Sequence, residues 1–307
     1  MRNAVIQAIE EIAKQNSEIM AVTADLGYGV WESFAERFPD RFFNVGISEQ
    51  LMTSAAAGMA LSGNIVFTYS IGNFATLRCL EQIRNDVCYH NANVKIIAVG
   101  GGFSYGQLGM SHHATEDISM MRTLPNMRVF VPADPEEAVA CLKEAVQTDG
   151  PCYIRLARRG EPVLYPKSKN FNIAEIQPVI KGHSAALLAC GPILKNALGA
   201  AERLTAQQIS VSVYSVPCVK PIDNVKIRVL ANIYPVLVTI EEHEITGGLG
   251  GAVSEIVGEL PELHARVCRL GLQDTYTNQV GSYDYLCDYY GLSSKAIAEE
   301  VRKVVEA

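Results

Sequence analysis

One carboxylate stands where an ionised group is least expected. Glu49 follows the apolar run Phe42–Val45 and opens the alanine-rich segment Glu49–Leu61, which has no other charged residue. A carboxyl group at the edge of such a dry interior loses solvation when it ionises, so it tends to keep its proton. A side chain of that kind can donate or share a proton near neutral pH. The structural alternative is that Ser48 caps the helix and Glu49 complements the helix dipole.

A glycine-rich stretch ends in two adjacent histidines. The glycines at 100–102, 106 and 109 follow the apolar run Val94–Val99 and precede His112 and His113. Ligands gather beyond the carboxyl ends of parallel strands, which makes His112 a candidate for substrate contact. The alternative is a solvated loop histidine. Adjacent side chains point in different directions, and the sequence has no H-x-x-x-H pattern, so no metal site is expected.

Two further patterns are open to more than one interpretation. Arg155, Arg158 and Arg159 follow an apolar run, where arginines can clamp phosphate or carboxylate; a solvated cluster or an interdomain ion pair is equally compatible. The glycines at 247, 248, 250 and 251 weakly resemble a dinucleotide-binding turn. The loop before them is too long for that turn, so a helix start is the better interpretation.

The elements that would position these residues alternate along the chain. Strands are predicted at Ile19–Thr23, Phe42–Val45, Ile65–Thr68, Val94–Val99, Arg128–Val131 and Cys152–Leu156. Helices are predicted at Asn3–Lys14, Glu49–Leu61, Phe74–Tyr89 and Pro135–Gln147, the last with Asp134 as its N-cap. Alternation of this kind is typical of a mostly parallel sheet covered on both faces.

A second, smaller α/β unit is expected after an irregular polar segment. Its predicted strands are Ala185–Cys190, Val211–Ser215 and Val236–Ile240, and its predicted helices are Ile193–Leu204, Asp223–Tyr234 and Gly250–Leu260. We therefore expect an α/β protein of two parallel or mixed-sheet domains, 1–165 and 183–307, joined by a linker over 166–182.

Composition narrows the functional class. The 307 residues are 49% hydrophobic and 19% charged, with a net charge of −7 and no basic block, which argues against nucleic acid and anionic membranes as partners. No uncharged apolar run reaches the roughly 18 residues needed to span a bilayer. The first fifteen residues fit an amphipathic helix better than a secretion signal. Eight cysteines without a C-x-x-C pair suggest free thiols in a reducing cytoplasm.

Four segments together resemble the C-terminal half of a transketolase, an enzyme dependent on thiamine diphosphate. They are NVGISEQ (44–50), FATLRCLEQIRNDV (74–87), MSHHATEDISMMRTLPNMRVFVPAD (110–134) and EEHEITGGLGGAVSE (241–255). The third is the longest and most specific match. The resemblance covers nearly the whole chain and implies a pyrimidine-binding domain followed by the small C-terminal domain of that family.

The resemblance implies a role for several residues. Glu49 would hydrogen-bond the N1′ atom of the cofactor's aminopyrimidine and favour the tautomer that removes the thiazolium C2 proton. Phe74 would stack on the pyrimidine, and Asp25 would lie close to the cofactor. His112 would face the substrate and handle its hydroxyl protons, and Arg158 would hold its phosphate.

One family motif is missing from the sequence. Transketolases hold the diphosphate through Mg²⁺ bound by a G-D-G segment and a downstream asparagine, and no such pair is present here. The resemblance therefore implies a split enzyme in which a separate N-terminal subunit carries the diphosphate and Mg²⁺ site. An α2β2 heterotetramer with the active site at the subunit interface is expected.

Several polar positions of the family pattern are replaced. The family's phosphate-binding serine falls at Gly29, a substrate histidine at Gly100, and the acidic residue that reads the donor hydroxyl at Leu108. Two aromatic positions of the pyrimidine pocket fall at Ile71 and Leu77. Losing a charged hydrogen-bond partner costs about 1.5–3 kcal/mol, which is enough to redirect substrate preference. The expected substrate is therefore a modified sugar, a nucleotide-linked sugar or a 2-oxo acid.

Two other functions remain open on the sequence. The β subunit of a 2-oxo acid dehydrogenase E1 has the same domain order and split but performs decarboxylation. A non-catalytic partner subunit is also compatible with the glycine and leucine replacements. Against the latter, a chain that only binds has no use for Glu49 and Phe74.

Overall fold

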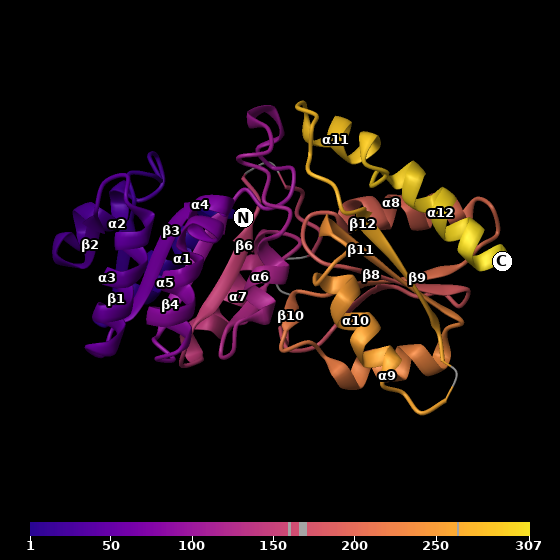
Figure 1. Ribbon diagram of the computed structural model, residues 1–307, viewed down its shortest axis with the longest axis horizontal. Helices are drawn as coiled ribbons and strands as arrows, with labels where there is room; N and C mark the ends of the chain where they lie inside the picture. Colours follow the sequence, from indigo (N-terminus) through magenta and orange to yellow (C-terminus); the bar gives the residue numbers. More distant parts are fainter. Residues whose placement is uncertain (159–160, 166–170, 263) are drawn as a thin grey trace.

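Two β-sheets organise the chain in the computed structural model, which describes residues 1–158, 161–165, 171–262 and 264–307 (Figure 1). In spatial order the first sheet consists of β10 (Cys218–Lys220), β5 (Arg128–Phe130), β6 (Cys152–Leu156), β4 (Val94–Val99), β3 (Ile65–Ile71), β1 (Ile19–Thr23) and β2 (Phe42–Asn44). The second consists of β12 (Arg266–Leu272), β11 (Val236–Glu244), β8 (Ala185–Ala189), β9 (Val211–Ser215) and β7 (Gln177–Ile180). Among the described strands, the only antiparallel pairs are β10 with β5 and β7 with β9.

Helices cover both sheets, as expected for parallel strands that are buried on two faces. Those of the first unit are α1 (Arg2–Ala13), α2 (Glu32–Arg37), α3 (Glu49–Leu61), α4 (Gly72–Ala75), α5 (Leu80–Gln82), α6 (Asp117–Thr123) and α7 (Pro135–Gln147). Those of the second are α8 (Leu194–Thr205), α9 (Asn224–Ile233), α10 (Leu249–Gly258), α11 (Tyr283–Tyr289) and α12 (Ser294–Glu306). In Figure 1, α8 and α12 lie on one side of the second sheet, with α9 and α10 on the other.

The predicted α/β fold class is confirmed, and most elements lie within a few residues of their expected ends. α3 and α7 begin and end as predicted. The Asp134 carboxylate accepts a hydrogen bond from the Glu137 amide at 2.8 Å and so caps α7. The glycine run after β11 begins α10, where the Glu241 carboxylate accepts hydrogen bonds from the Leu249 and Gly250 amides.

The single helix predicted over Phe74–Tyr89 is wrong. The chain forms α4, a 3₁₀ turn η2 (Leu77–Cys79), α5 and a π-helical segment η3 (Ile83–Cys88). The Thr76 hydroxyl donates to the Gly72 carbonyl at 2.7 Å, and the Cys79 thiol donates to the Phe74 carbonyl. Side chains that take backbone carbonyls in this way bend or interrupt a helix.

The separation of the two units is less simple than expected. Strand β10 comes from the second unit in sequence but pairs with β5 of the first sheet. The predicted linker 166–182 includes β7, which pairs with β9 at the edge of the second sheet. The second unit therefore contributes a strand to the first sheet, and β7 belongs with the second sheet.

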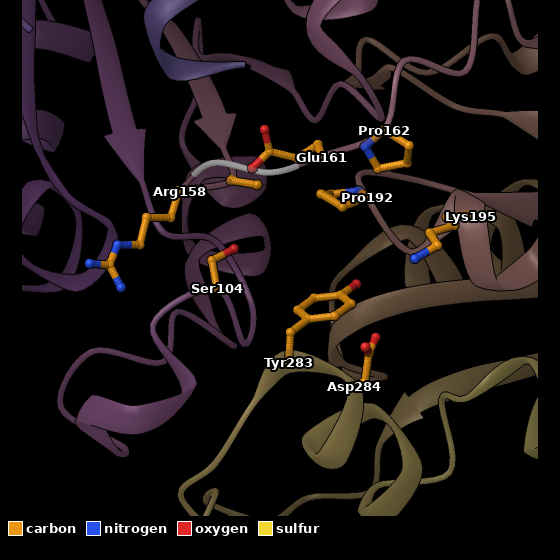
Figure 2. A pocket seen from close by; sticks show the side chains of 9 residues that line it. Ser104, Arg158, Glu161, Pro162, Pro192, Lys195, Tyr283 and Asp284 are labelled. Carbon is orange, nitrogen blue, oxygen red and sulfur yellow. The ribbon is translucent and has the colours of Figure 1, made fainter.

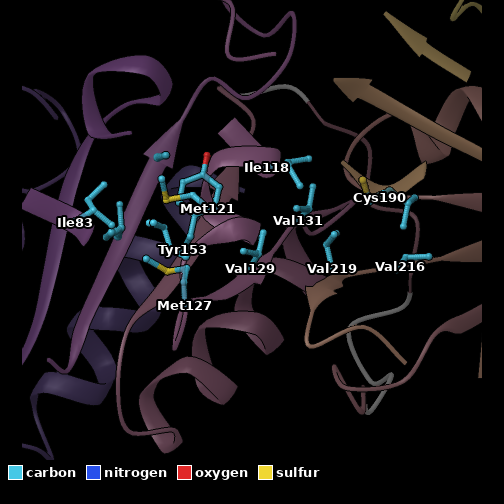
Figure 3. Packing of buried hydrophobic residues seen from close by; sticks show 14 of the residues in the cluster. Ile83, Ile118, Met121, Met127, Val129, Val131, Tyr153, Cys190, Val216 and Val219 are labelled. Carbon is cyan, nitrogen blue, oxygen red and sulfur yellow. The ribbon is translucent and has the colours of Figure 1, made fainter. Parts of the chain in front are cut away.

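An apolar cluster continues from one sheet to the other. Figure 3 shows Val129 and Val131 of the first unit near Val216 and Val219, with Cys190 beyond them. Each buried valine contributes about 1.5–3 kcal/mol relative to an exposed one, so this junction fixes the two units against each other. The loops at the carboxyl edge of the first sheet are therefore held against the C-terminal unit.

Two further sequence-based expectations concern membrane-spanning segments and cysteines. In the described part, no helix is long and apolar enough to cross a bilayer. All eight cysteines are free, and seven are buried, as predicted from their places inside apolar runs.

Candidate active site

The candidate residues follow the carboxyl ends of neighbouring parallel strands. Asp25 comes after β1, Glu49 after β2, Phe74 after β3, His112 after β4 and Arg158 after β6. Because β6, β4, β3, β1 and β2 are parallel neighbours, the loops that follow them emerge at one edge of the sheet. Such an edge is where open α/β sheets bind ligands.

Glu49 is buried at the start of α3 and pairs with a cation that the sequence analysis did not single out. Its side chain is 3% exposed, and Arg78 Nη1 donates to Glu49 Oε2 at 2.7 Å. The Arg78 guanidinium carbon lies 4.1 Å from the centre of the Phe74 ring. Ser48 makes no side-chain capping bond, so that part of the structural alternative is wrong. The surroundings of Glu49 are therefore not purely apolar, because the Arg78 guanidinium contacts its carboxylate.

His112 stands beside the same aromatic ring. The imidazole and Phe74 ring centres are 5.2 Å apart in an edge-to-face arrangement, and Ser111 Oγ lies 3.0 Å from His112 Nδ1. Burial first, and then the nearby Arg78 charge, lower the pKa of His112 below its usual value. A histidine with a lowered pKa is mainly neutral at pH 7 and can both accept and donate a proton.

His113 serves a different purpose. It is buried and lies 2.7 Å from the Thr277 hydroxyl through Nδ1, while Nε2 donates to the Gly106 carbonyl at 3.1 Å. With its proton on Nε2, Nδ1 accepts from Thr277. These two bonds tie the glycine-rich loop to the C-terminal unit, and this loop carries His112.

Tyr105 occupies the space in front of Gly100. Gly100 has φ +95°, and a Cβ there would lie 2.1 Å from the Tyr105 ring. The tyrosine ring centre is 6.2 Å from that of His112, and the Arg158 guanidinium carbon lies 5.0 Å from it. Tyr105 therefore links two predicted substrate residues. The glycine at position 100 was the available signal in the sequence. The sequence alone did not show that Tyr105 fills the space where a side chain would lie.

A cavity of about 350 Å³ lies where the two units meet, with Arg158 at its edge. Figure 2 shows Lys195, Tyr283 and Asp284 of the C-terminal unit across from Ser104, while the Arg158 side chain points away. Arg158 therefore faces Tyr105 rather than this cavity. Arg159, considered with it above, lies outside the described residues.

The structure places Arg155 in a buried ion pair and not in a phosphate clamp. Its Nε donates to Asp117 Oδ2 at 2.8 Å, and both side chains are almost fully buried. Nη2 donates to the Ala114 carbonyl at 2.7 Å and to the Glu242 carbonyl at 3.0 Å. Arg155 therefore forms a buried ion pair with Asp117 inside the first unit. Its contact with the second unit is a hydrogen bond to the Glu242 backbone carbonyl of β11, and not the interdomain ion pair that was one of the alternatives.

The remaining predicted site residues are Asp25, Ile71, Leu77 and Leu108. Asp25 bonds to residues other than those around Glu49. Its amide donates to Asn44 Oδ1 at 2.9 Å, and its carboxylate accepts from the Tyr28 hydroxyl. Asp25 has φ +54°. Ile71 ends β3 and is half-buried, and Leu77 and Leu108 are 49% and 52% exposed.

Exposed apolar side chains flank Glu49 in the sequence. Ile47 is 81% exposed and Leu51 54%, on either side of Glu49 in the chain. Leu77 precedes Arg78, whose carbonyl accepts from Gln50 at 3.1 Å, which brings that turn close to the start of α3. Large apolar groups gathered in this way commonly mark an interaction surface.

Comparison with known proteins places this geometry in a family. Residues 1–161 match the transketolase pyrimidine binding domain, and residues 174–297 match the transketolase C-terminal domain. The chain belongs to the transketolase family. The sequence-based resemblance is thereby confirmed, and the chain corresponds to the C-terminal section of a split transketolase.

Proteins of similar length share this organisation. A putative transketolase C-terminal section from Methanocaldococcus jannaschii is 36% identical over 98% of this chain and 95% of its own. The 6-deoxy-6-sulfo-D-fructose transketolase subunit SqwH from Clostridium sp. is 33% identical, covering 100% and 94%. A solved structure described as a split gene transketolase, inactive beta4 tetramer, superposes with a TM-score of 0.89 at 36% identity, covering 99% and 97%.

Proposed function

We propose that this chain supplies the aminopyrimidine half of a thiamine diphosphate site and, with an N-terminal partner subunit, transfers a two-carbon ketol unit between sugars. The observation that carries this is the buried Glu49 carboxylate at the carboxyl edge of the sheet, which shares the Arg78 guanidinium with the Phe74 ring. When bound, thiamine diphosphate supplies the electron sink that allows the bond between C2 and C3 of a ketose to break.

The residues present fit an aminopyrimidine. A carboxylate that is 3% exposed, with an oxygen already engaged by an N–H donor, suits the ring nitrogen of such a group. Phe74 offers a flat apolar face for stacking. We assign Glu49 to hold and exchange the proton at N1′, with Ile71 and Leu77 as the apolar wall and Asp25 close to the cofactor.

The substrate side consists of His112 and Arg158, flanked by Gly100 and Leu108. The lowered pKa of His112 favours the neutral imidazole, which can take up and return a hydroxyl proton of the sugar. Arg158 provides a guanidinium for a phosphate or another anionic group. The aromatic ring of Tyr105 lies between these two residues, so it borders the same space.

The other half of the site belongs to the partner. The sequence contains no G-D-G segment for a Mg²⁺-bound diphosphate. The exposed Ile47, Leu51 and Leu77 offer an apolar docking surface next to Glu49. We propose that an N-terminal subunit carrying G-D-G and a downstream asparagine docks there, holds Mg²⁺ and the diphosphate, and forms an α2β2 assembly in the cytoplasm. The proposed domains are 1–165 and 183–307, with β7 from the segment between them at the edge of the second sheet.

A modified sugar is the proposed substrate. The relative from Clostridium sp. is named for a sulfonated deoxy sugar, and positions 29, 100 and 108 of this chain lack the polar side chains of the family pattern. Gly100 cannot take a side chain without moving Tyr105. A polar contact to an ordinary pentose phosphate is therefore replaced by an aromatic one.

Substrate choice is testable with the reconstituted complex. We expect turnover of xylulose 5-phosphate with ribose 5-phosphate to be at least about tenfold below that of an ordinary transketolase, since losing one charged hydrogen bond costs about 1.5–3 kcal/mol. Ketol transfer from 6-deoxy-6-sulfofructose and related modified ketoses, followed by mass spectrometry, is the comparison. Pyruvate with an artificial electron acceptor is the control for decarboxylation. Ordinary transketolase rates with the pentose phosphates would contradict the proposed preference.

A further inference from the structure

We infer that Arg78 occupies the place of the aminopyrimidine in the unloaded subunit and that the cofactor must displace it. This rests on the proposed function, because it assigns the aminopyrimidine to Glu49 and Phe74. Arg78 engages both of these residues at once, through the 2.7 Å bond to Glu49 Oε2 and the 4.1 Å approach to the Phe74 ring.

The two contacts of Arg78 are the two that an aminopyrimidine needs. A guanidinium is flat and rich in N–H donors, so it can stack on an aromatic ring while it donates to a carboxylate. An aminopyrimidine is also flat and, with a proton at N1′, donates to a carboxylate in the same way. His112 already packs against Phe74 edge-to-face, at 5.2 Å between ring centres, which leaves less of that ring free for a second group.

The position of Arg78 allows its side chain to move away from Glu49 and Phe74. Its side chain is 43% exposed, whereas Glu49 is 3% exposed, so the ion pair is half open to water on the arginine side. Because water solvates the arginine side, breaking this pair costs less than breaking a fully buried one. The interruption of the helix at η2, where Arg78 lies, removes the regular helical frame that would otherwise fix its side chain.

The proposed docking surface of the partner lies next to this arginine. Leu77, immediately before Arg78, is 49% exposed on the proposed docking surface. The Arg78 carbonyl accepts from the Gln50 side chain at the start of α3, so movement of η2 is coupled to the segment that carries Glu49. In the unassembled chain, Arg78 neutralises the buried carboxylate and closes the pyrimidine site.

The test compares three variants of the assembled complex with the wild type in their binding of thiamine diphosphate with Mg²⁺ by calorimetry. Arg78→Ala is expected to bind about three- to thirtyfold more tightly than wild type, because no ion pair or ring contact has to be broken first. Arg84→Ala is the matched control, because Arg84 is an exposed arginine six residues on that bonds to Asn85. It is expected to bind as wild type does. Arg78→Lys, which keeps the charge without the flat face, is expected to fall between the first two.

A second readout uses the full chain without its partner. The free fragment 4-amino-5-hydroxymethyl-2-methylpyrimidine, titrated by NMR, is expected to bind Arg78→Ala at least about threefold more tightly than wild type. Equal or weaker binding by Arg78→Ala and Arg78→Lys, in a complex whose wild type binds thiamine diphosphate, would overturn the inference and leave the proposed function standing. A wild-type complex that does not bind thiamine diphosphate would overturn both.

Discussion

Replacement of Glu49 by glutamine is expected to lower C2-proton exchange of bound thiamine diphosphate by about 10²–10⁴-fold in the assembled complex. Glutamine keeps the size of the side chain and can hydrogen-bond the ring, but it cannot hold and return a proton. The variant complex is expected to remain folded, since the lost partner, Arg78, is half-exposed. Deuterium exchange at C2, quenched with acid and followed by NMR, measures the step directly.

The control for this experiment is Glu81→Gln, because Glu81 is exposed and lies in α5, directly after η2. It removes the same charge near the site without touching the proposed proton path, and exchange is expected at the wild-type rate. Exchange at the wild-type rate in Glu49→Gln itself would show that this carboxylate does not control the cofactor's proton.

Replacement of Arg155 by methionine is expected to cost about 3–5 kcal/mol of the free energy of unfolding, because it leaves the Asp117 carboxylate buried without its cation. Asp117 is fully buried, and Arg155 also donates to the Ala114 and Glu242 carbonyls, so the change breaks a network that spans both units. Urea unfolding followed by circular dichroism measures the loss in the full chain.

A matched surface pair separates this effect from the general loss of an arginine. Arg228 lies 3.8 Å from Glu259, and both side chains are exposed. Arg228→Met is therefore expected to change the free energy of unfolding by less than about 1 kcal/mol. Adding Asp117→Asn to Arg155→Met is expected to recover part of the loss, since the stranded charge is then removed. A cost near that of Arg228→Met would contradict the stabilising role given to the buried Arg155–Asp117 pair.

Local sequence patterns were enough to predict much of the fold. The alanine-rich run of α3 and the Asp134 cap of α7 are strong signals, because they depend on neighbouring residues alone. The strand–helix alternation predicted the α/β class and the edge at which Glu49, His112 and Arg158 gather. The roles given to these residues came from the transketolase resemblance and stay predictions.

The rest depends on contacts between residues far apart in the chain. Strand β10 is three residues long and is fixed by pairing with β5, which no local pattern can show. The break between α4 and α5 arises where the Thr76 side chain takes a backbone carbonyl. Arg78 stands four residues after Phe74, a spacing that permits contact, but its pairing with Glu49 joins residues 29 positions apart. Whether the interior around that carboxylate is dry is therefore set by the fold.

The most direct test of the account is the affinity for thiamine diphosphate with Mg²⁺, measured by calorimetry on this chain alone, on its N-terminal partner alone, and on the two together. We expect weak binding by each subunit and tight binding, at least about a hundredfold stronger, by the complex, because each chain would supply only part of the site. Binding to this chain alone that is as tight as binding to the complex would contradict it.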